Sequence, residues 1–279
     1  MVSPVRLVDR IKVRLARVSD NPTLEAQVLL AHILGRQRSW VLAHPEISLN
    51  AEQTVELESR LARLEAGEPL PYVLRRWEFF GLDFSVGPQV LIPRPETELL
   101  VEQALAWLRA HPGRRMALDV GTGSGCIALA LALNIPDLHI LASDISGGAL
   151  ELAKENLRRY AFPAWVEFIQ ADLIPAICEP VDLICANLPY IPASELDNLQ
   201  VSRWEPRLAL DGGPDGLCLI RRFLGQAPSS LAPGGLLLME IEASQGPTAL
   251  ELARQAFPRA EIVLLPDLAG RDRLVRIQN

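Results

Sequence analysis

Apolar residues near the start of the chain recur at the spacing of amphipathic helices. Ile11 and Leu15 share one face of the first predicted helix, because residues three or four apart lie on the same side of a helix. Pro22 and Asn50 are suited to begin two longer helices, and a short helix is expected between these two. The pattern predicts a small helical bundle over residues 1–67.

Beyond the bundle the apolar positions switch to a two-residue period. Leu82, Phe84 and Val86 alternate with other residues, which is typical of a strand, and Gly81 separates two such runs. We therefore expect a linker over residues 68–93 that contains a β-hairpin.

The remaining segment, residues 94–279, alternates short apolar runs with helical patterns. Pro95 begins a helix. Strands are predicted at MALDV, HILASD, VEFIQ, VDLICAN, LLLMEIE, EIVLL and LVRIQ, with helices between the first three. Strands that alternate with helices favour an α/β fold with a doubly wound, parallel, Rossmann-like sheet. Such sheets bind ligands at the carboxyl ends of their strands.

Composition narrows the possible partners. The 279 residues carry a formal net charge of -7, so we expect no direct nucleic-acid binding, which depends on Lys and Arg contacts to phosphates. Charges interrupt every long apolar run, which argues against a signal peptide and a membrane span and favours a cytoplasmic protein. The cysteines and histidines lack zinc-ligand spacing, so no metal is expected. No helix has the pattern of an association seam, which favours a monomer.

A glycine-rich loop follows the first strand of the predicted sheet and precedes a helix. The run DVGTGSG contains the candidate cofactor-binding residues Gly121, Thr122, Gly123, Ser124 and Gly125. Glycines allow sharp turns and the close approach of a ligand. A dinucleotide site and a turn without a ligand are the alternatives. The dinucleotide pattern G-x-G-x-x-G is incomplete, because Cys126 takes its last position.

Acidic residues follow the next two strands. Asp144 ends the second strand, where a carboxylate can accept hydrogen bonds from the ribose hydroxyls of a nucleoside cofactor. Asp172 follows the third strand and can accept from an adenine amino group, while Leu173 offers a backbone amide and an apolar edge. Each aspartate alone is equally typical of a turn, but together with the glycine loop they favour a nucleoside site.

The fourth strand ends in Asn187, Leu188, Pro189 and Tyr190. This run resembles the Asn-Pro-Pro-Tyr motif of methyltransferases that act on amide or amino nitrogens, with Leu188 in place of the first proline. Longer phrases, LIPRPETE, DVGTGSGCIAL, EPRLALDGGPDGL and LAPGGLLLMEIE among them, resemble bacterial protein-glutamine methyltransferases of the HemK/PrmC type. The resemblance is strong over about residues 65–279. Glu242 departs from it, since the family usually has glycine there.

That resemblance implies a class I methyltransferase fold, S-adenosyl-L-methionine as cofactor, and class-one peptide chain release factors as partners. The family methylates the glutamine of their Gly-Gly-Gln motif, and its N-terminal bundle helps to bind the factor. An amide nitrogen is a poor nucleophile, so positioning carries most of the catalysis. The resemblance assigns the two acceptors of the amide hydrogens to the Asn187 side-chain oxygen and the Leu188 carbonyl. Tyr190 can stack on the amide, and Pro189 keeps Leu188 extended.

Two other functions remain open at this point. A nucleic-acid amino methyltransferase would share the Asn-x-Pro-Tyr pattern, although LIPRPETE and the mixed charge of the bundle argue against it. A nucleotide-binding module without catalysis is the second alternative, and it does not require Asn187 or Tyr190. We interpret Glu205 and Asp211, in the loop after the motif, as turn residues rather than parts of the acceptor site.

Overall fold

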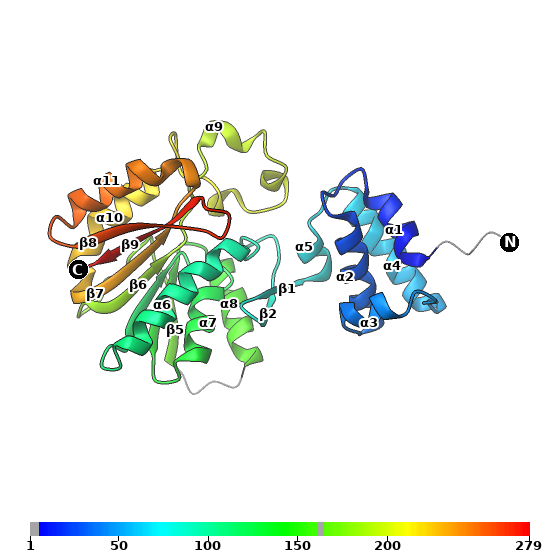
Figure 1. Cartoon of the computed structure of the whole chain (residues 1–279), viewed down its shortest axis with the longest axis horizontal. Coiled ribbons are helices and arrows are strands. Elements are labelled where there is room, and N and C mark those ends of the chain that lie inside the picture. Colours follow the sequence, from blue (N-terminus) through cyan, green and yellow to red (C-terminus); the bar gives the residue numbers. More distant parts are fainter. Residues whose placement is uncertain (1–5, 161–164) are drawn as a thin grey trace. The chain divides into compact units, whose positions relative to one another are not determined.

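A computed structural model of the chain describes residues 6–160 and 165–279. The chain divides into two compact units on either side of the Arg76–Trp77 bond (Figure 1). Helices and their connections make up the smaller, N-terminal unit over residues 6–75. The larger unit contains the sheet on which the predicted cofactor and acceptor motifs lie.

The N-terminal unit consists of α1 (Leu7–Leu15), α2 (Pro22–Leu34), α3 (Arg38–Ala43), α4 (Ala51–Glu65) and α5 (Leu70–Leu74). Asn50 caps α4 by accepting a hydrogen bond from the backbone N–H of Gln53, whose side chain accepts one from the Asn50 N–H in return. The four helices predicted in this region are confirmed. The fifth lies in the segment that was assigned to the linker, and it forms because Leu70 and Val73 bury against the core of the bundle.

The larger unit is built on a seven-stranded sheet with the order β5-β4-β3-β6-β7-β9-β8. The strands are β3 (Met116–Val120), β4 (His139–Asp144), β5 (Trp165–Gln170), β6 (Val181–Ala186), β7 (Leu231–Glu240), β8 (Glu261–Pro266) and β9 (Asp272–Gln278). The order reverses between β3 and β6, because β4 and β5 extend to one side and β7 to the other. Ligands bind at such a switch point in open α/β sheets.

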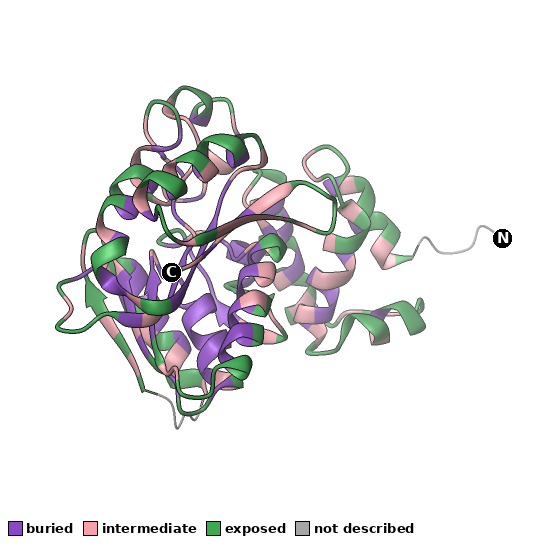
Figure 2. Ribbon diagram, turned by 60° about the vertical axis from the view of Figure 1, so that its left-hand side comes forward, coloured by how far each residue is buried: buried purple, intermediate pink, exposed green. Residues whose placement is uncertain are grey.

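Helices cover both faces of this sheet, and the central strands are buried between them (Figure 2). These covering helices are α6 (Glu98–Ala110), α7 (Cys126–Asn134), α8 (Gly147–Arg159), α10 (Cys218–Ser230) and α11 (Gly246–Ala256), whereas the short α9 (Ala193–Leu196) lies in the loop region that follows β6. Alternate strand residues such as Leu118, Ile184 and Leu237 belong to one core cluster with Phe223 of α10 and Ala249 of α11. The two-residue period of the strands thus separates two apolar layers.

One strand departs from the predicted parallel sheet. β9 runs antiparallel to both β7 and β8. The connection from β8 to β9 spans only residues 267–271, and a parallel crossover needs a dozen residues or more. The backbone N–H groups of Ala269 and Arg271 both donate to the Asp267 carboxylate, which closes this tight turn.

The predicted hairpin is formed by β1 (Arg76–Phe79) and β2 (Leu82–Ser85). Phe80 and Gly81 make its turn with φ of 52° and 70°, the left-handed pair that a type I′ turn requires. A glycine therefore fits the second position at no cost, and the Glu98 carboxylate accepts a hydrogen bond from the Phe80 N–H at 2.8 Å. The hairpin is tied to the sheet unit by Asn156 of α8, which hydrogen-bonds to both the N–H and the carbonyl of Ser85.

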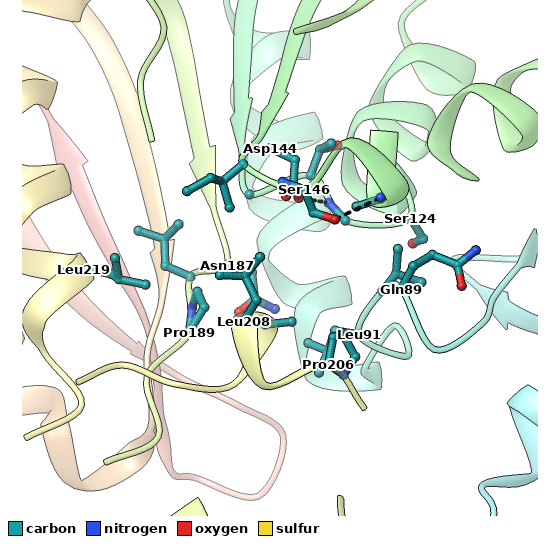
Figure 3. A pocket seen from close by; sticks show the side chains of 18 of the residues that line it. Gln89, Leu91, Ser124, Asp144, Ser146, Asn187, Pro189, Pro206, Leu208 and Leu219 are labelled. Atoms are coloured by element: carbon teal, nitrogen blue, oxygen red, sulfur yellow. Dashed lines mark hydrogen bonds between the residues drawn. The ribbon is translucent and has the colours of Figure 1, made fainter. Parts of the chain in front are cut away.

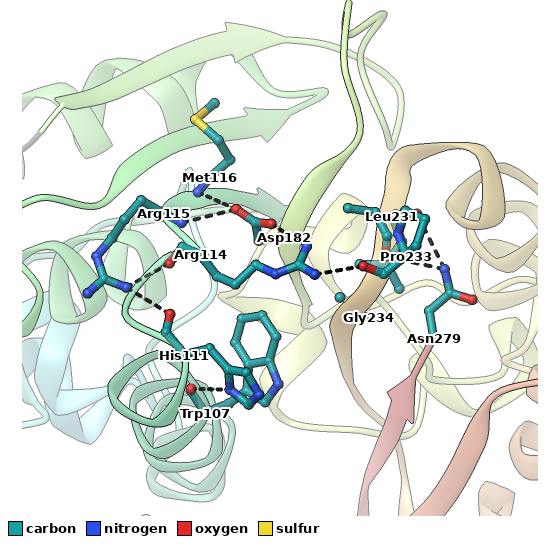
Figure 4. Close-up of polar contacts among 12 residues, drawn as sticks. Trp107, His111, Arg114, Arg115, Met116, Asp182, Leu231, Pro233, Gly234 and Asn279 are labelled. Carbon is teal, nitrogen blue, oxygen red and sulfur yellow. Dashed lines mark hydrogen bonds and ion pairs between the residues drawn. The ribbon is translucent and has the colours of Figure 1, made fainter.

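The amino ends of the central strands are held together by Asp182, as Figure 4 shows. Its carboxylate, near the start of β6, accepts from the backbone N–H groups of Arg115 and Met116 at 3.0 and 3.1 Å. The Arg114 side chain donates both to this carboxylate and to the Pro233 carbonyl in β7, each at 2.8 Å. A single charged cluster thereby fixes β3, β6 and β7 at the edge of the sheet where the strands begin.

Candidate active site

A cavity of about 580 Å³ opens at the carboxyl ends of β3, β4 and β6. That volume is typical of a site for a small organic ligand. Figure 3 shows Asp144 and Asn187 at its wall, together with Gln89, Leu91 and Pro206. The predicted site residues that line it are Gly121, Thr122, Gly123, Ser124, Asp144, Asp172, Leu173, Asn187, Leu188 and Pro189.

The glycine loop needs its glycines for two reasons. Gly121, Gly123 and Gly125 have φ of 73°, 56° and 81°, a region that side chains disfavour. A Cβ on Gly121 would also lie 3.2 Å from Leu188 Cδ2, so the loop and the acceptor motif are already in close contact. Gly125 does not line the cavity, and a Cβ there would lie 3.2 Å from the Cβ of Ala153 in α8. Its role is therefore to let α8 pack closely against the loop.

Asp119, near the end of β3, stabilises the glycine loop. Its carboxylate is buried and accepts from the Thr122 hydroxyl at 2.6 Å and from the Ala128 N–H at 3.3 Å. Burial raises the pKa of this carboxyl to about 7, and these two hydrogen bonds act in the opposite direction. The side chain therefore links the end of β3 to the first turn of α7.

Asp144 lies in the cavity wall with acceptor capacity to spare. One carboxylate oxygen accepts from the Gly123 N–H at 2.9 Å and the other from the Ser146 N–H at 2.8 Å. Burial raises the pKa of this carboxyl, while the backbone hydrogen bonds favour its charged form. A carboxylate has about four lone-pair positions, so two further hydroxyl donors can be accommodated.

Asp172, the second predicted acidic residue, has a partner that the sequence did not indicate. Arg222 of α10 donates to the Asp172 carboxylate at 2.6 Å, and both side chains are about half exposed. Any hydrogen bond from a ligand to Asp172 must use the remaining lone pairs. Leu173 beside it has a φ of 66°, unusual for a residue with a side chain, and its carbonyl accepts from the Ser143 hydroxyl at 3.0 Å.

The acceptor motif follows β6 directly. The Asn187 side-chain N–H₂ donates to the hydroxyl oxygen of Thr97 at 3.0 Å, which leaves the side-chain oxygen for the cavity. Thr97 is buried and is part of the LIPRPETE run. Sequence analysis did not single it out, because a threonine before a helix is also typical of a cap.

Tyr190 does not line the cavity. Its carbonyl accepts from the Gln245 side chain at 2.9 Å, and burial raises the pKa of its phenol to about 12. Stacking of this ring on a target amide stays a prediction. Leu188 is buried in the core cluster with Leu237, so its side chain has a packing role besides its place in the motif.

Glu205 is more than a turn residue. Its buried carboxylate accepts from the Ile92 N–H at 3.0 Å and pairs with the Arg94 guanidinium. The segment of Gln89–Arg94 and the segment of Pro206–Ala209 both contribute to the cavity wall, and Glu205 joins them. Our interpretation of Glu205 as a plain turn was wrong, because a contact across more than a hundred residues leaves no local pattern.

Within residues 6–160 and 165–279, no three His, Cys, Asp or Glu side chains are arranged to hold a metal ion. In the same ranges, none of the helices has the length and apolar character of a membrane span.

Two family models match the chain. One is described as the PrmC N-terminal domain and matches residues 6–74, and the other is the methyltransferase small domain at residues 96–202. The release factor glutamine methyltransferase of Moorella thermoacetica is 44% identical over 256 residues, which cover 91% of this chain and 90% of that protein. The protein of the same name from Bordetella pertussis is 42% identical over 256 residues, covering 91% and 93%. A methyltransferase structure from Pyrococcus furiosus matches with a TM-score of 0.51 at 17% identity, over 82% of this chain and 98% of that chain, which shows a shared fold.

Proposed function

Because this chain belongs to the family of release factor glutamine methyltransferases, we propose that it methylates a side-chain amide nitrogen of glutamine in class-one peptide chain release factors. The target is the glutamine of their Gly-Gly-Gln motif. The observation that carries this proposal is the Asn187 side chain, whose N–H₂ group is engaged by Thr97 and whose oxygen is left for an amide donor. The match of residues 6–74 to the N-terminal domain of this family argues against the nucleic-acid alternative.

S-adenosyl-L-methionine is the cofactor that we propose for the cavity, and it supplies an electrophilic methyl group on a sulfonium sulfur. The residues present fit it. A Cβ on Gly121 would lie only 3.2 Å from Leu188 Cδ2, so glycine keeps the space beside Leu188 free for a ligand. Asp144 retains lone pairs for two ribose hydroxyls. Asp172 and Leu173 line the same cavity and are proposed to face the adenine.

The acceptor amide is proposed to bind between Asn187 and Leu188. Two acceptors that hold both hydrogens of the amide orient its nitrogen, and orientation is worth much of the barrier for a weak nucleophile. A cationic amide sheds its proton readily after methylation, so no strong base is required. Pro189 keeps the Leu188 backbone extended, which suits a carbonyl that must point at a ligand. The helical unit is proposed to contribute to recognition of the folded release factor.

The proposed function is tested with labelled S-adenosyl-L-methionine and a purified release factor. We expect label on the Gly-Gly-Gln glutamine and none on a matched factor in which that glutamine is replaced by alanine. Label on DNA or RNA, with none on the factor, would reject the proposal in favour of the nucleic-acid alternative.

Removing the Asp144 carboxylate should weaken cofactor binding. Hydrogen bonds to a charged acceptor are worth roughly 1.5–3 kcal/mol, so Asp144→Ala should lose about tenfold to a hundredfold in affinity. Asp144→Asn, which keeps one acceptor oxygen, should lose less. Calorimetry with S-adenosyl-L-methionine measures both, and NAD should not bind to the wild-type protein. An unchanged affinity in Asp144→Ala would remove this residue from the cofactor site.

Restoring proline at position 188 should leave methyl transfer at or above its wild-type rate. The required group is a backbone carbonyl, and proline fixes φ in the range that the family motif uses. The cost is packing, because the buried Leu188 side chain contacts the core and is only partly replaced by the proline ring. Single-turnover methylation and thermal unfolding of Leu188→Pro separate these effects. A folded but inactive variant would contradict the proposed alignment of the motif.

A further inference from the structure

The backbone of the acceptor motif is held by a side chain from a distant part of the chain. Gln245 ends the short 3-10 helix Ala243–Gln245, which follows β7, and it is 8% exposed. Its side-chain N–H₂ group donates to the Tyr190 carbonyl at 2.9 Å and to the Gly216 carbonyl at 3.3 Å. One amide therefore joins the end of the acceptor motif to the loop that precedes α10.

The orientation of this amide is fixed by its oxygen. The Gln245 Oε1 accepts from the backbone N–H of Glu242 at 3.3 Å. An amide oxygen accepts and an N–H₂ group donates, so the three contacts of the side chain all fit the same orientation. The Glu242 carboxylate closes the same turn by accepting from the Ser244 N–H at 2.6 Å. The Gln245 side chain is thereby preorganised as a donor toward the motif.

The loop behind the motif packs directly against the Tyr190 backbone. A Cβ on Gly212 would lie 2.8 Å from the Tyr190 Cα, closer than side chains approach a backbone. The Ile191 N–H donates to the Leu210 carbonyl at 3.0 Å, and the Gly212 N–H donates to the Ile191 carbonyl at 2.8 Å. The chain that leaves the motif is therefore anchored on this loop, and Gln245 adds a side-chain donor at the same place.

We propose that Gln245 is a positioning residue for methyl transfer, which fixes the Tyr190 peptide and through it the Leu188 carbonyl. Pro189 has a locked φ, and it restricts Leu188 to extended conformations. The soft dihedrals between the two carbonyls are thus ψ of Pro189 and φ and ψ of Tyr190, and a held Tyr190 carbonyl constrains them. The consequence for catalysis rests on the proposed function, in which the Leu188 carbonyl accepts from the target amide, whereas the hold on the motif is a property of the protein alone.

Gln245→Met removes the donor and keeps a side chain of similar length. Single-turnover methylation at saturating cofactor and release factor should slow about 10- to 100-fold, because a small misplacement at a reacting centre commonly costs that much. KM for the factor and the affinity for S-adenosyl-L-methionine should stay within about twofold of the wild type, since the lost contact acts on the transition state. Gln245→Glu, which has the same shape but turns an oxygen toward the two carbonyls, should be at least as slow. A wild-type rate in either variant would overturn the proposal.

Gln278 offers a matched control at the opposite edge of the sheet. Its N–H₂ group also donates to two backbone carbonyls, those of Gly234 and Gly235 at 3.0 and 3.1 Å, and its Oε1 accepts from the Trp107 side chain at 3.0 Å. Gln278→Met should therefore lower the midpoint of thermal unfolding as Gln245→Met does, with the rate of methyl transfer unchanged. Equal slowing by both variants would show a general effect of stability, and the positioning role would be rejected.

Hydrogen exchange tests the hold on the motif without any substrate. The Ile191 and Gly212 N–H groups belong to the bridge between the end of the motif and its loop. In Gln245→Met they should exchange about tenfold faster than in the wild type, whereas in Gln278→Met their exchange should be unchanged. Unchanged exchange in Gln245→Met would overturn the inference whether or not the chain methylates release factors.

The two measurements together separate this inference from the proposed function. Faster exchange in Gln245→Met with wild-type methyl transfer would show that the hold has no part in catalysis, and the positioning role would be rejected. A wild-type protein that methylates no release factor would reject the proposed function, and exchange would still decide whether Gln245 holds the motif.

Discussion

Replacing Asn187 with alanine should slow methyl transfer by ~10²–10³, by comparison with the removal of other preorganised groups at a reacting centre. Cofactor affinity should change far less, because the side-chain oxygen is proposed to hold the acceptor amide. The alanine variant also leaves the Thr97 oxygen without the donor that lies 3.0 Å away. Single-turnover methylation of a release factor, with cofactor binding measured separately by calorimetry, resolves the two effects.

Asn187→Asp is the sharper variant at the same position. An aspartate keeps an acceptor oxygen for the amide, but its negative charge would stabilise the charged cofactor before transfer and so oppose the reaction. Its second oxygen would also replace the N–H₂ group that donates to the Thr97 hydroxyl oxygen. We expect cofactor binding at least as tight as in the wild type, with slow turnover. Wild-type rates in both variants would mean that Asn187 is structural, and the proposed acceptor site would fall with it.

Removal of residues 1–74 should leave the cofactor site intact and cripple methylation of the folded release factor. The core of the sheet unit is formed by its own residues, from Leu118 to Ile277, and every residue of the cavity wall lies between Gln89 and Arg222. If the helical unit supplies one or two dominant contacts of ~2 kcal/mol each, kcat/KM for the factor should fall between ~30-fold and ~10³-fold.

A short peptide that contains Gly-Gly-Gln is the matched control for this truncation. The peptide offers no surface to a recognition unit, so the truncated and full-length proteins should methylate it at the same low rate. Cofactor affinity, measured by calorimetry, should also match. A truncated protein that methylates the intact factor at the wild-type rate would remove the helical unit from substrate recognition.

Local patterns predicted much of the fold and part of the site. The two-residue period of the strands and the glycine loop both depend on residues that are close in sequence, so both could be predicted from it. The positions of Asp144 and Asn187 at strand ends followed from the same pattern, because parallel strands bring their carboxyl ends to one edge. The direction of β9 was not predicted, since an apolar run carries no sign of its orientation and only the short turn at residues 267–271 decides it.

The supporting groups of the site could not be predicted in the same way. Thr97 and Asn187 are 90 positions apart, and Ile92 and Glu205 are 113 apart, so only the folded chain brings them together. Glu205 lies in a loop, and an acidic residue there is as typical of an exposed turn as of a buried ion pair. Its burial depends on the helices and strands around it, which no window of sequence contains.

The cluster around Asp182 has a consequence for how this architecture diverges. It fixes the starts of β3, β6 and β7, while the cavity and the acceptor loop lie at the opposite edge of the same strands. We therefore expect changes in the loops around the cavity to leave the strand register unchanged, because the contacts of Asp182 lie at the other edge of the sheet. Such a division of labour permits wide divergence in sequence without loss of the fold, and the methyltransferase from Pyrococcus furiosus shares this fold at 17% identity. The segment after β6 is therefore the part of the chain in which a change of acceptor specificity should disturb the sheet least.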